Sequence, residues 1–159
     1  MPESLVFSAN VRLSPLGPIR LVASDGALVG ADFTDGPERD RNPILEAAAA
    51  WLAAYFAGRP LPPAPPLAPT GTPFQRRVWS AICGIPYGQV RTYGAIARAV
   101  GVPRASRAVG GANRANPLVL FVPCHRVVAA GGLLGGYSAG LPRKRWLLRH
   151  ERACARPAE

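Results

Sequence analysis

A proline-rich segment divides this chain of 159 residues and limits what can form around it. Residues 60–73 read PLPPAPPLAPTGTP, and seven of these fourteen positions are proline. Proline fixes the backbone φ angle and lacks an N–H donor, so this segment is expected to form neither a helix nor a central strand. The sequence therefore predicts one domain over residues 1–59, a linker over residues 60–71 and a second domain over residues 72–159.

The first domain has the pattern of strands followed by a helix. Turn-forming residues separate three apolar segments, at residues 5–13, 19–23 and 28–33. This spacing predicts an antiparallel meander with tight turns. Asn42 and Pro43 then offer an N-cap and a first-turn proline for an alanine-rich helix over residues 44–56.

Charge is divided unevenly along the chain. Residues 1–70 carry five arginines and seven acidic residues, whereas residues 71–150 carry twelve basic residues and no acidic residue. A basic half of this kind is typical of a protein that binds a polyanion, most often nucleic acid. An arginine-rich proteome is the simpler explanation, since 18 of the 19 basic residues are arginine. The absence of acids over eighty residues nevertheless favours phosphate contact.

Composition excludes several other classes of protein. A hydrophobic content of 48% supports a folded core, and no apolar run approaches the roughly 18 residues of a membrane span. The N-terminus lacks the basic and apolar regions of a secretory signal. The three cysteines form no CxxC pair and there are only two histidines, so neither disulfides nor a metal site is indicated. We expect a reduced, cytoplasmic protein without metal.

The second domain has the pattern of a helix-turn-helix. Thr72 and Pro73 begin a helix whose core positions recur every four residues, at Phe74, Val78 and Ile82. Thr92 can cap a second helix over residues 93–100. After a Gly-Val-Pro turn, a third helix over about residues 104–114 carries several arginines. A helix pair of this kind with an arginine-rich second helix is typical of DNA binding.

Cys124 is the candidate nucleophile. It follows the apolar run 118–122, which we expect to be buried, and it is next to His125 and Arg126. Because nearby cations lower the pKa of a cysteine thiol, this placement favours a thiolate. A small buried core residue is the alternative, and it suits Cys83 and Cys154 better, with Cys83 expected on the buried side of its helix.

The heptad VPCHRVV at residues 122–128 resembles the active-site signature of the O6-alkylguanine-DNA alkyltransferases, the methylated-DNA–protein-cysteine methyltransferases. Further motifs of this family follow the same order: TPFQ (72–75), IPYG (85–88), TYGAIA (92–97), RAVG (107–110), NRANP (113–117) and GYS (136–138). The resemblance covers residues 72–152. It implies an α+β fold: an N-terminal ribonuclease-H-like antiparallel sheet plus helix, and a C-terminal helical domain with a helix-turn-helix and an active-site cysteine.

The resemblance implies a chemistry as well. The family transfers an alkyl group, usually methyl, from O6 of guanine in DNA to its own cysteine, once per molecule and without a cofactor. Cys124 matches the nucleophile, His125 the residue that takes its proton through a water, and Glu151 the residue that orients His125. Asn116 matches the residue that holds the hydrogen bonds of the site, and Tyr93 the one whose hydroxyl serves guanine N3.

The resemblance also implies how DNA is bound. The damaged base is flipped out of the duplex, and Arg107 fills its place from the minor groove. Further residues expected near DNA or the base are Tyr93, Gly94, Ala105, Ser106, Val127, Tyr137 and Ser138. We expect double-stranded DNA containing O6-alkylguanine as the partner of a monomer. Cooperativity on DNA and activity on O4-methylthymine are left open.

Three other functions fit parts of the pattern. Alkyltransferase-like proteins share the fold but lack the cysteine and only bind lesions, so the presence of Cys124 argues against this reading. A transcription factor would use the helix-turn-helix, but nothing flanking it is suited to sensing or dimerisation. A cysteine hydrolase would need an oxyanion hole and would not explain the acid-free half.

Overall fold

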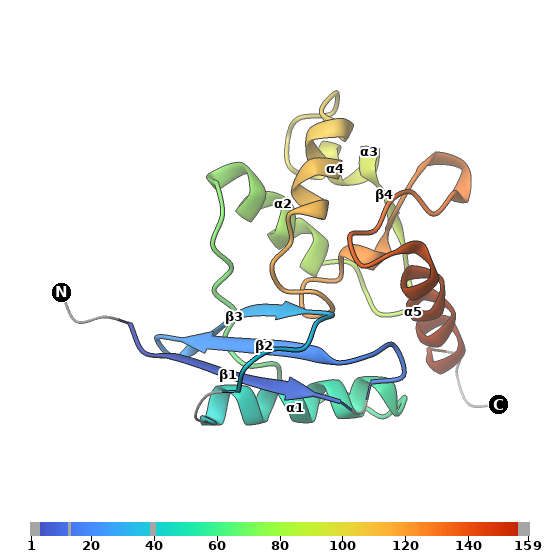
Figure 1. Cartoon of the computed structure of the whole chain (residues 1–159). Helices are drawn as coiled ribbons and strands as arrows, with labels where there is room; N and C mark the ends of the chain where they lie inside the picture. Colours follow the sequence, from blue (N-terminus) through green and yellow to red (C-terminus); the bar gives the residue numbers. More distant parts are fainter. Residues whose placement is uncertain (1–3, 13, 39–40, 156–159) are drawn as a thin grey trace. The chain divides into compact units, whose positions relative to one another are not determined.

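The structure is a computed structural model of the chain, and it describes residues 4–12, 14–38 and 41–155 (Figure 1). Two compact units make up the chain. The N-terminal unit comprises Met1–Thr70 together with Pro117–Val119, and the C-terminal unit comprises Gly71–Asn116 and Leu120–Glu159.

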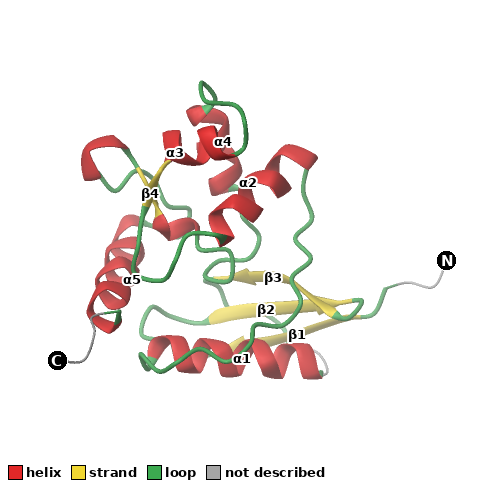
Figure 2. Ribbon diagram, turned by 180° about the vertical axis from the view of Figure 1, so that it is seen from behind, coloured by secondary structure: helices red, strands yellow, loops and turns green. Residues whose placement is uncertain are grey.

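The N-terminal unit contains a three-stranded antiparallel sheet in the order β1-β2-β3 (Figure 2). Its strands are β1 (Val6–Val11), β2 (Ile19–Ser24) and β3 (Ala27–Asp32). The meander predicted from the sequence is confirmed, although position 13 lies outside the described residues. Asp25 and Gly26 join β2 to β3 with φ angles of 50° and 77°. Two consecutive positive φ angles are characteristic of a type I′ turn, whose twist matches that of the hairpin.

Helix α1 (Pro43–Phe56) covers one face of this sheet. Its start is fixed locally, because the Asn42 side chain accepts a hydrogen bond from the Leu45 amide at 2.9 Å. The buried face of α1 includes Leu45, Leu52 and Tyr55, which are all about 1% exposed or less. The helix predicted over residues 44–56 is therefore confirmed.

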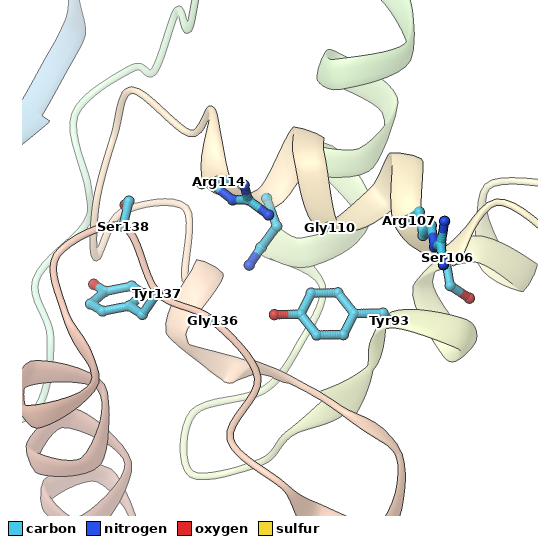
Figure 3. A pocket seen from close by; sticks show the side chains of 9 residues that line it. Tyr93, Ser106, Arg107, Gly110, Arg114, Gly136, Tyr137 and Ser138 are labelled. Carbon is cyan, nitrogen blue, oxygen red and sulfur yellow. The ribbon is translucent and has the colours of Figure 1, made fainter.

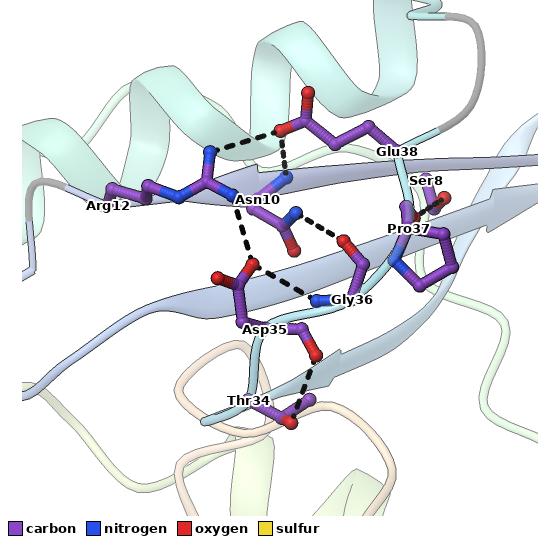
Figure 4. A network of polar contacts seen from close by, with 8 residues as sticks. All are labelled: Ser8, Asn10, Arg12, Thr34, Asp35, Gly36, Pro37 and Glu38. Carbon is purple, nitrogen blue, oxygen red and sulfur yellow. Dashed lines mark hydrogen bonds and ion pairs between the residues drawn. The ribbon is translucent and has the colours of Figure 1, made fainter.

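A polar network fastens the segment after β3 to β1 (Figure 4). The Asn10 side-chain amide donates to the Gly36 carbonyl at 2.7 Å, and the Asn10 backbone amide donates to a Glu38 carboxylate oxygen at 3.2 Å. Arg12 forms an ion pair with Asp35 at 3.1 Å. These contacts order a loop without secondary structure along the outer strand of the sheet.

The proline-rich segment forms no helix, as predicted, but it is not a free linker. The Leu28 amide donates to the Pro66 carbonyl at 2.8 Å, and the Ala68 amide donates to the Leu28 carbonyl at 2.9 Å. Residues 117–119 likewise pair with Ala31 of β3. Both segments cover the outer edge of β3, which would otherwise present unpaired backbone groups.

The C-terminal unit is mainly helical. Its helices are α2 (Pro73–Cys83), α3 (Tyr93–Ala99), α4 (Ser106–Arg114) and α5 (Leu141–Cys154). A short parallel pair joins β4 (Arg91–Thr92) to β5 (Val127–Val128), and two 3-10 turns, η1 (Cys124–Arg126) and η2 (Ala130–Gly132), lie on either side of β5. Helices α2, α3 and α4 pack on one another around a core of Val78, Trp79, Ile82, Ile96 and Val109. The indole N–H of Trp79 donates to the Ala112 carbonyl at 2.8 Å and so ties α2 to α4.

Helices α3 and α4 with the turn between them form the expected helix-turn-helix. Thr92 accepts a hydrogen bond from the Ala95 amide and caps α3, as predicted. Helix α4 begins at Ser106, two residues later than predicted, and Ala105 at its N-cap provides no side-chain hydrogen bond.

One expectation about burial is wrong. Cys83 is exposed rather than buried, because it follows Ile82 and so lies about 100° around α2 from the core face. The run 118–122 is buried as predicted. The chain turns at Leu120, where φ is 71°, and Cys124 lies in the 3-10 turn η1. No helix within the described ranges is long and apolar enough to cross a membrane.

Candidate active site

Two asparagines at the C-terminal end of α4 hold the backbone around Cys124. The Asn116 side chain donates to the Val122 carbonyl at 2.9 Å, and the Asn113 side chain donates to the Cys124 carbonyl at 3.2 Å. All four residues lie within the C-terminal unit and are buried. The thiol is therefore presented from a fixed backbone, with Cys124 itself only 1% exposed.

The Cys124 thiol is not made acidic by Arg126. Burial raises the pKa of the thiol, while a hydrogen bond from the Asn116 side chain and the positive charge of Lys144 oppose this effect. The Arg126 guanidinium is turned away toward Glu151, so the expectation that it supports a thiolate is wrong. Because the resting group is a thiol at neutral pH, its reaction requires a base.

His125 and Glu151 form a buried pair that can supply this base. The His125 Nε2 atom lies 2.7 Å from a Glu151 carboxylate oxygen, and both side chains are at most 1% exposed. Burial raises the pKa of Glu151, but hydrogen bonds from His125 and Arg126 outweigh it and lower this pKa to about 2. An ionised carboxylate only accepts hydrogen bonds, so Nε2 carries the hydrogen and donates it.

The other ring nitrogen of His125 is then an acceptor. Burial lowers the pKa of His125, with the hydrogen bond to Glu151 opposing it, so the imidazole is neutral near pH 7. The Nδ1 atom is buried and has no hydrogen-bond partner among the described residues. A neutral imidazole with one nitrogen fixed and the other unpaired is suited to accept a proton.

Lys144 is a buried cation that the sequence analysis missed. Its side chain on α5 is 0% exposed, and its Nζ atom donates to the Val127 carbonyl at 2.7 Å and to the Gly136 carbonyl at 2.9 Å. Burial lowers the pKa of Lys144 to about 8, and the charge of Cys124 opposes this. One signal could have found it, since Lys144 is the only lysine in a chain with 18 arginines.

A cavity of about 510 Å³ lies among α3, α4 and the loop that precedes α5 (Figure 3). This size is typical of a small-molecule or base pocket. Figure 3 shows the Tyr93 hydroxyl pointing toward the wall formed by Gly136 and Tyr137. The cavity is lined by Tyr93, Ser106, Arg107, Gly110, Asn113, Arg114, Gly136, Tyr137 and Ser138.

Five of the residues expected at DNA or the base line this cavity, namely Tyr93, Ser106, Arg107, Tyr137 and Ser138. Three others do not. Gly94 lies beside Arg98 and Ser106, Ala105 precedes α4, and the Val127 carbonyl is bound by Lys144. Cys124 is not part of the cavity lining either.

The lining also includes positions that the sequence analysis did not assign to the base. Gly110, Asn113 and Arg114 lie on α4 at three- and four-residue steps from Ser106 and Arg107, so one face of this helix forms the wall. Helical spacing is the signal that could have identified them.

The loop between η2 and α5 approaches Tyr93 closely. Gly135 has a φ of +68°, and a Cβ atom added there would lie 2.8 Å from the Tyr93 hydroxyl oxygen. Only glycine adopts this backbone readily and leaves the tyrosine in place. Among the described parts of the chain, no group of three His, Cys, Asp or Glu side chains could hold a metal ion.

Comparison with known proteins identifies the family to which this chain belongs. A model of the 6-O-methylguanine DNA methyltransferase ribonuclease-like domain matches residues 11–69, and a model of the DNA-binding domain of that methyltransferase matches residues 73–153. The chain belongs to the 6-O-methylguanine DNA methyltransferase family. The ribonuclease-like N-terminal domain and the α+β fold implied by the motifs are thereby confirmed.

Relatives of this methyltransferase family span nearly the whole chain. The methylated-DNA–protein-cysteine methyltransferase of Methanosarcina acetivorans is 45% identical over 149 residues, which cover 89% of this chain and 96% of the relative. The O6-methylguanine methyltransferase of Mycobacterium tuberculosis has a TM-score of 0.85 at 40% identity, covering 98% of this chain and 97% of its own. A structure of the M. tuberculosis protein in complex with DNA matches at a TM-score of 0.83 and 41% identity, over 93% and 94% of the two chains.

Proposed function

We propose that this methyltransferase repairs DNA directly, by moving a methyl or other alkyl group from O6 of guanine to Cys124. Relatives of 45% identity carry the corresponding name, and a related protein forms a complex with DNA. The observation that carries the proposal within this chain is that Cys124 and His125 share one 3-10 turn, with His125 paired to the buried Glu151 of α5.

The reaction we propose begins with the thiol proton. His125 accepts this proton at Nδ1, through a bridging water, while Glu151 stabilises the imidazolium that forms. The sulfur then attacks the alkyl carbon in line with the C–O bond. A carbon–sulfur bond forms as the C–O bond breaks, and the electron pair of the C–O bond stays on guanine. The guanine ring then takes up a proton equivalent to the one that His125 accepted from the thiol, and the imidazole becomes neutral again. The products are an S-alkylcysteine and unmodified guanine.

Asn116 and Lys144 support the charged state of the sulfur in this scheme. The hydrogen bond from Asn116 and the charge of Lys144 both lower the pKa of Cys124 against the effect of burial. Tyr93 is assigned to the leaving base. Its hydroxyl serves guanine N3, and burial raises the pKa of this hydroxyl, so it stays protonated and able to donate.

The proposal for DNA binding rests on the arginine-rich helix α4. Arg107 is exposed at the edge of the cavity, where it can enter the minor groove and take the place of the flipped base. The cavity then receives the base beside Tyr93. We propose minor-groove binding by a monomer, with transfer carried by residues 72–159 and the N-terminal domain of residues 1–59 joined through the proline-rich segment 60–71. In this proposal Gly94 and Ala105 lie next to the DNA. Val127 keeps its assignment to the base site, although its carbonyl accepts from Lys144 and does not line the cavity.

Mass spectrometry tests the proposed transfer. The protein is incubated with duplex DNA containing one O6-methylguanine, digested and mapped. We expect the mass of one added methylene on the peptide with Cys124, and none on Cys83 or Cys154, both of which are exposed. Cys124→Ala should bind the duplex but acquire no methyl group. Tight lesion binding with an unmodified Cys124 would instead identify a lesion-binding protein without transferase activity.

A further inference from the structure

Arg126 is a buried cation that touches neither the cavity nor the reacting sulfur. It is 7% exposed, and its guanidinium binds both oxygens of Glu151, with Nε at 2.8 Å and Nη2 at 2.9 Å. Its third nitrogen, Nη1, donates to the Ile85 carbonyl at 2.8 Å. Its guanidinium also lies over the Tyr87 ring, 5.5 Å from the centroid. The bidentate geometry is the strongest that an arginine can offer a carboxylate.

The Glu151 carboxylate is surrounded by donors. One oxygen accepts from His125 Nε2 and Arg126 Nη2, and the other accepts from Arg126 Nε and from the Gly88 amide at 3.2 Å. Of these donors, only Arg126 brings a permanent positive charge. A buried carboxylate without such a cation draws a proton to itself or to its nearest titratable neighbour. Here that neighbour is His125.

We propose that Arg126 is a positioning residue, which balances the charge of Glu151 so that His125 remains a neutral base. The proposal rests on the proposed function for the reaction that this base serves. With Arg126 in place, His125 keeps a single hydrogen on Nε2 and an acceptor at Nδ1. Without it, the Glu151–His125 pair holds an extra proton, and an imidazolium cannot accept one from Cys124.

The turn at residues 85–88 contacts both Arg126 and Glu151 through its backbone. It accepts from Arg126 through Ile85 and donates to Glu151 through Gly88. Gly88 has a φ of +79°, and a Cβ atom there would lie 2.6 Å from the Ala155 Cβ atom. A side chain does not fit at this position. The turn is therefore a fixed part of the charge network.

Other titratable groups face this network from several elements. The charge of Lys144 acts on His125, and Cys124 acts on Lys144 and Tyr137. Tyr137 and Tyr87 interact with Glu151, Cys83 interacts with Arg126, and Cys154 interacts with Tyr87. Lys144, whose pKa is about 8, remains largely charged from pH 4 to pH 7. Burial raises the pKa values of Tyr87 and Tyr137, so these hydroxyls stay neutral in that range. A change in the acid range therefore reports on the Glu151–His125 pair.

The test compares pH profiles of Cys124 reactivity in Arg126→Met and wild-type protein. Two rates are measured from pH 4 to pH 8: benzyl transfer from free O6-benzylguanine, and iodoacetamide alkylation of Cys124 read by peptide mapping. We expect the acid limb of both profiles to move to higher pH by about one unit or more, because loss of a neighbouring cation favours protonation. Arg149→Met removes an exposed arginine from α5 and should leave both profiles unchanged.

A charge-neutral double variant separates this role from a purely structural one. In Arg126→Met/Glu151→Gln no unbalanced carboxylate remains, so the acid limb should return to the wild-type position although the rate stays lower. Removing both members of a buried ion pair also tends to preserve folding better than removing one. If Arg126→Met does not fold, Glu151→Gln replaces it in the comparison. Its unbalanced arginine should move the acid limb to lower pH, and the double variant should reverse that shift.

Two outcomes would overturn the proposal. One is an Arg126→Met profile that is slower at every pH but keeps its acid limb. The other is a shift that persists in the double variant. The iodoacetamide rate reads Cys124 without any guanine substrate. If the acid limb of the iodoacetamide profile shifts but the protein transfers no alkyl group, the role of Arg126 is supported and the proposed function is contradicted.

Discussion

Single residues set the charge around the nucleophile in a way that no local pattern shows. Lys144 donates to carbonyls eight and 17 positions away in the chain, and Arg126 binds a carboxylate 25 positions away. Cys124 and His125 could be identified from the sequence because their motif is contiguous. Glu151 and Asn116 could be assigned through the family resemblance. Lys144 and the contact between Arg126 and Glu151 could not, because these contacts exist only after α5 has packed against η1.

Replacing the buried lysine should weaken both reactivity and stability. In Lys144→Met the thiolate loses a nearby cation, and the buried Val127 carbonyl and the Gly136 carbonyl lose their donor. We expect alkyl transfer to slow about tenfold or more, because loss of this cation raises the pKa of the Cys124 thiol further. The free energy of unfolding should fall by about 1–3 kcal/mol. Stopped-flow transfer and urea denaturation measure the two effects. The neighbouring variant Arg145→Met, at an exposed position, should change neither, and equal losses in both variants would contradict the account.

Glu151 should make stability depend on pH in the acid range. Its pKa is lowered from 4.5 to about 2 in the folded protein, so the unfolded chain binds the proton more readily. The stabilisation is complete above pH 4.5 and is lost as the pH falls toward 2. A shift of this size corresponds to about 3 kcal/mol. Urea denaturation between pH 2 and pH 7 should show this loss in wild-type protein and not in Glu151→Gln.

Glu151→Gln should also be less stable at pH 7, by about 3–5 kcal/mol, because it leaves Arg126 buried without its partner. Parallel pH dependence in the wild type and this variant would remove Glu151 from the acid transition.

At the scale of elements, helices with local caps were predictable. Asn42, Thr72 and Thr92 each accept a hydrogen bond from an amide three residues later, and each marks the start of a helix correctly. Helix α4 was placed two residues too early because Ala105 carries no capping side chain. The path of the run 118–122 depends on Ala31 and Asn116, which are distant partners, and periodicity alone could not reveal its turn.

The loop before α5 should control which alkyl groups the cavity accepts. In Gly135→Ala the new Cβ atom would lie 2.8 Å from the Tyr93 hydroxyl and push the tyrosine or the loop aside. We expect transfer of a benzyl group to be reduced at least tenfold relative to transfer of a methyl group, about 1.4 kcal/mol of discrimination. Gly132→Ala is the matched control. Gly132 has a similar φ of +78°, but nothing lies within 4 Å of its added Cβ atom. The same loss in both variants would point to backbone strain rather than to contact with Tyr93.

Helix α4 should matter for duplex DNA and not for a free base. Arg107→Ala removes the side chain that we propose fills the place of the flipped base in the duplex. This side chain is needed only when a base must be held out of a duplex. Repair of an O6-methylguanine duplex should fall by about 10-fold to 100-fold, as expected for a loss of about 1.4–2.7 kcal/mol. Reaction with free O6-benzylguanine should remain near normal. Arg76→Ala, at an exposed site on α2, controls for loss of charge alone. Equal losses on both substrates would show instead that the pocket had been damaged.

The whole molecule combines a nearly neutral N-terminal part with a basic part that carries the site. The sequence predicted a division from charge and proline content. In the structure, residues 60–70 of the predicted linker and residues 117–119 belong to the N-terminal unit. The covered edge of β3 was not predicted, because proline-rich segments carry no periodic signal and the pairing depends on backbone groups of Leu28 and Ala31. In the proposed reaction each protein molecule acts once, because the transfer uses up its own cysteine. An S-alkylcysteine is a thioether, which thiol exchange does not reverse.

The proposed function requires that Cys124 itself keeps the alkyl group that leaves the DNA. The most direct test is the stoichiometry of repair with a large excess of duplex containing radiolabelled O6-methylguanine. We expect repair to stop at one methyl group per protein molecule, with all of the label bound to Cys124. Repair that continues well beyond one lesion per protein, or label on any other residue, would contradict the proposed function.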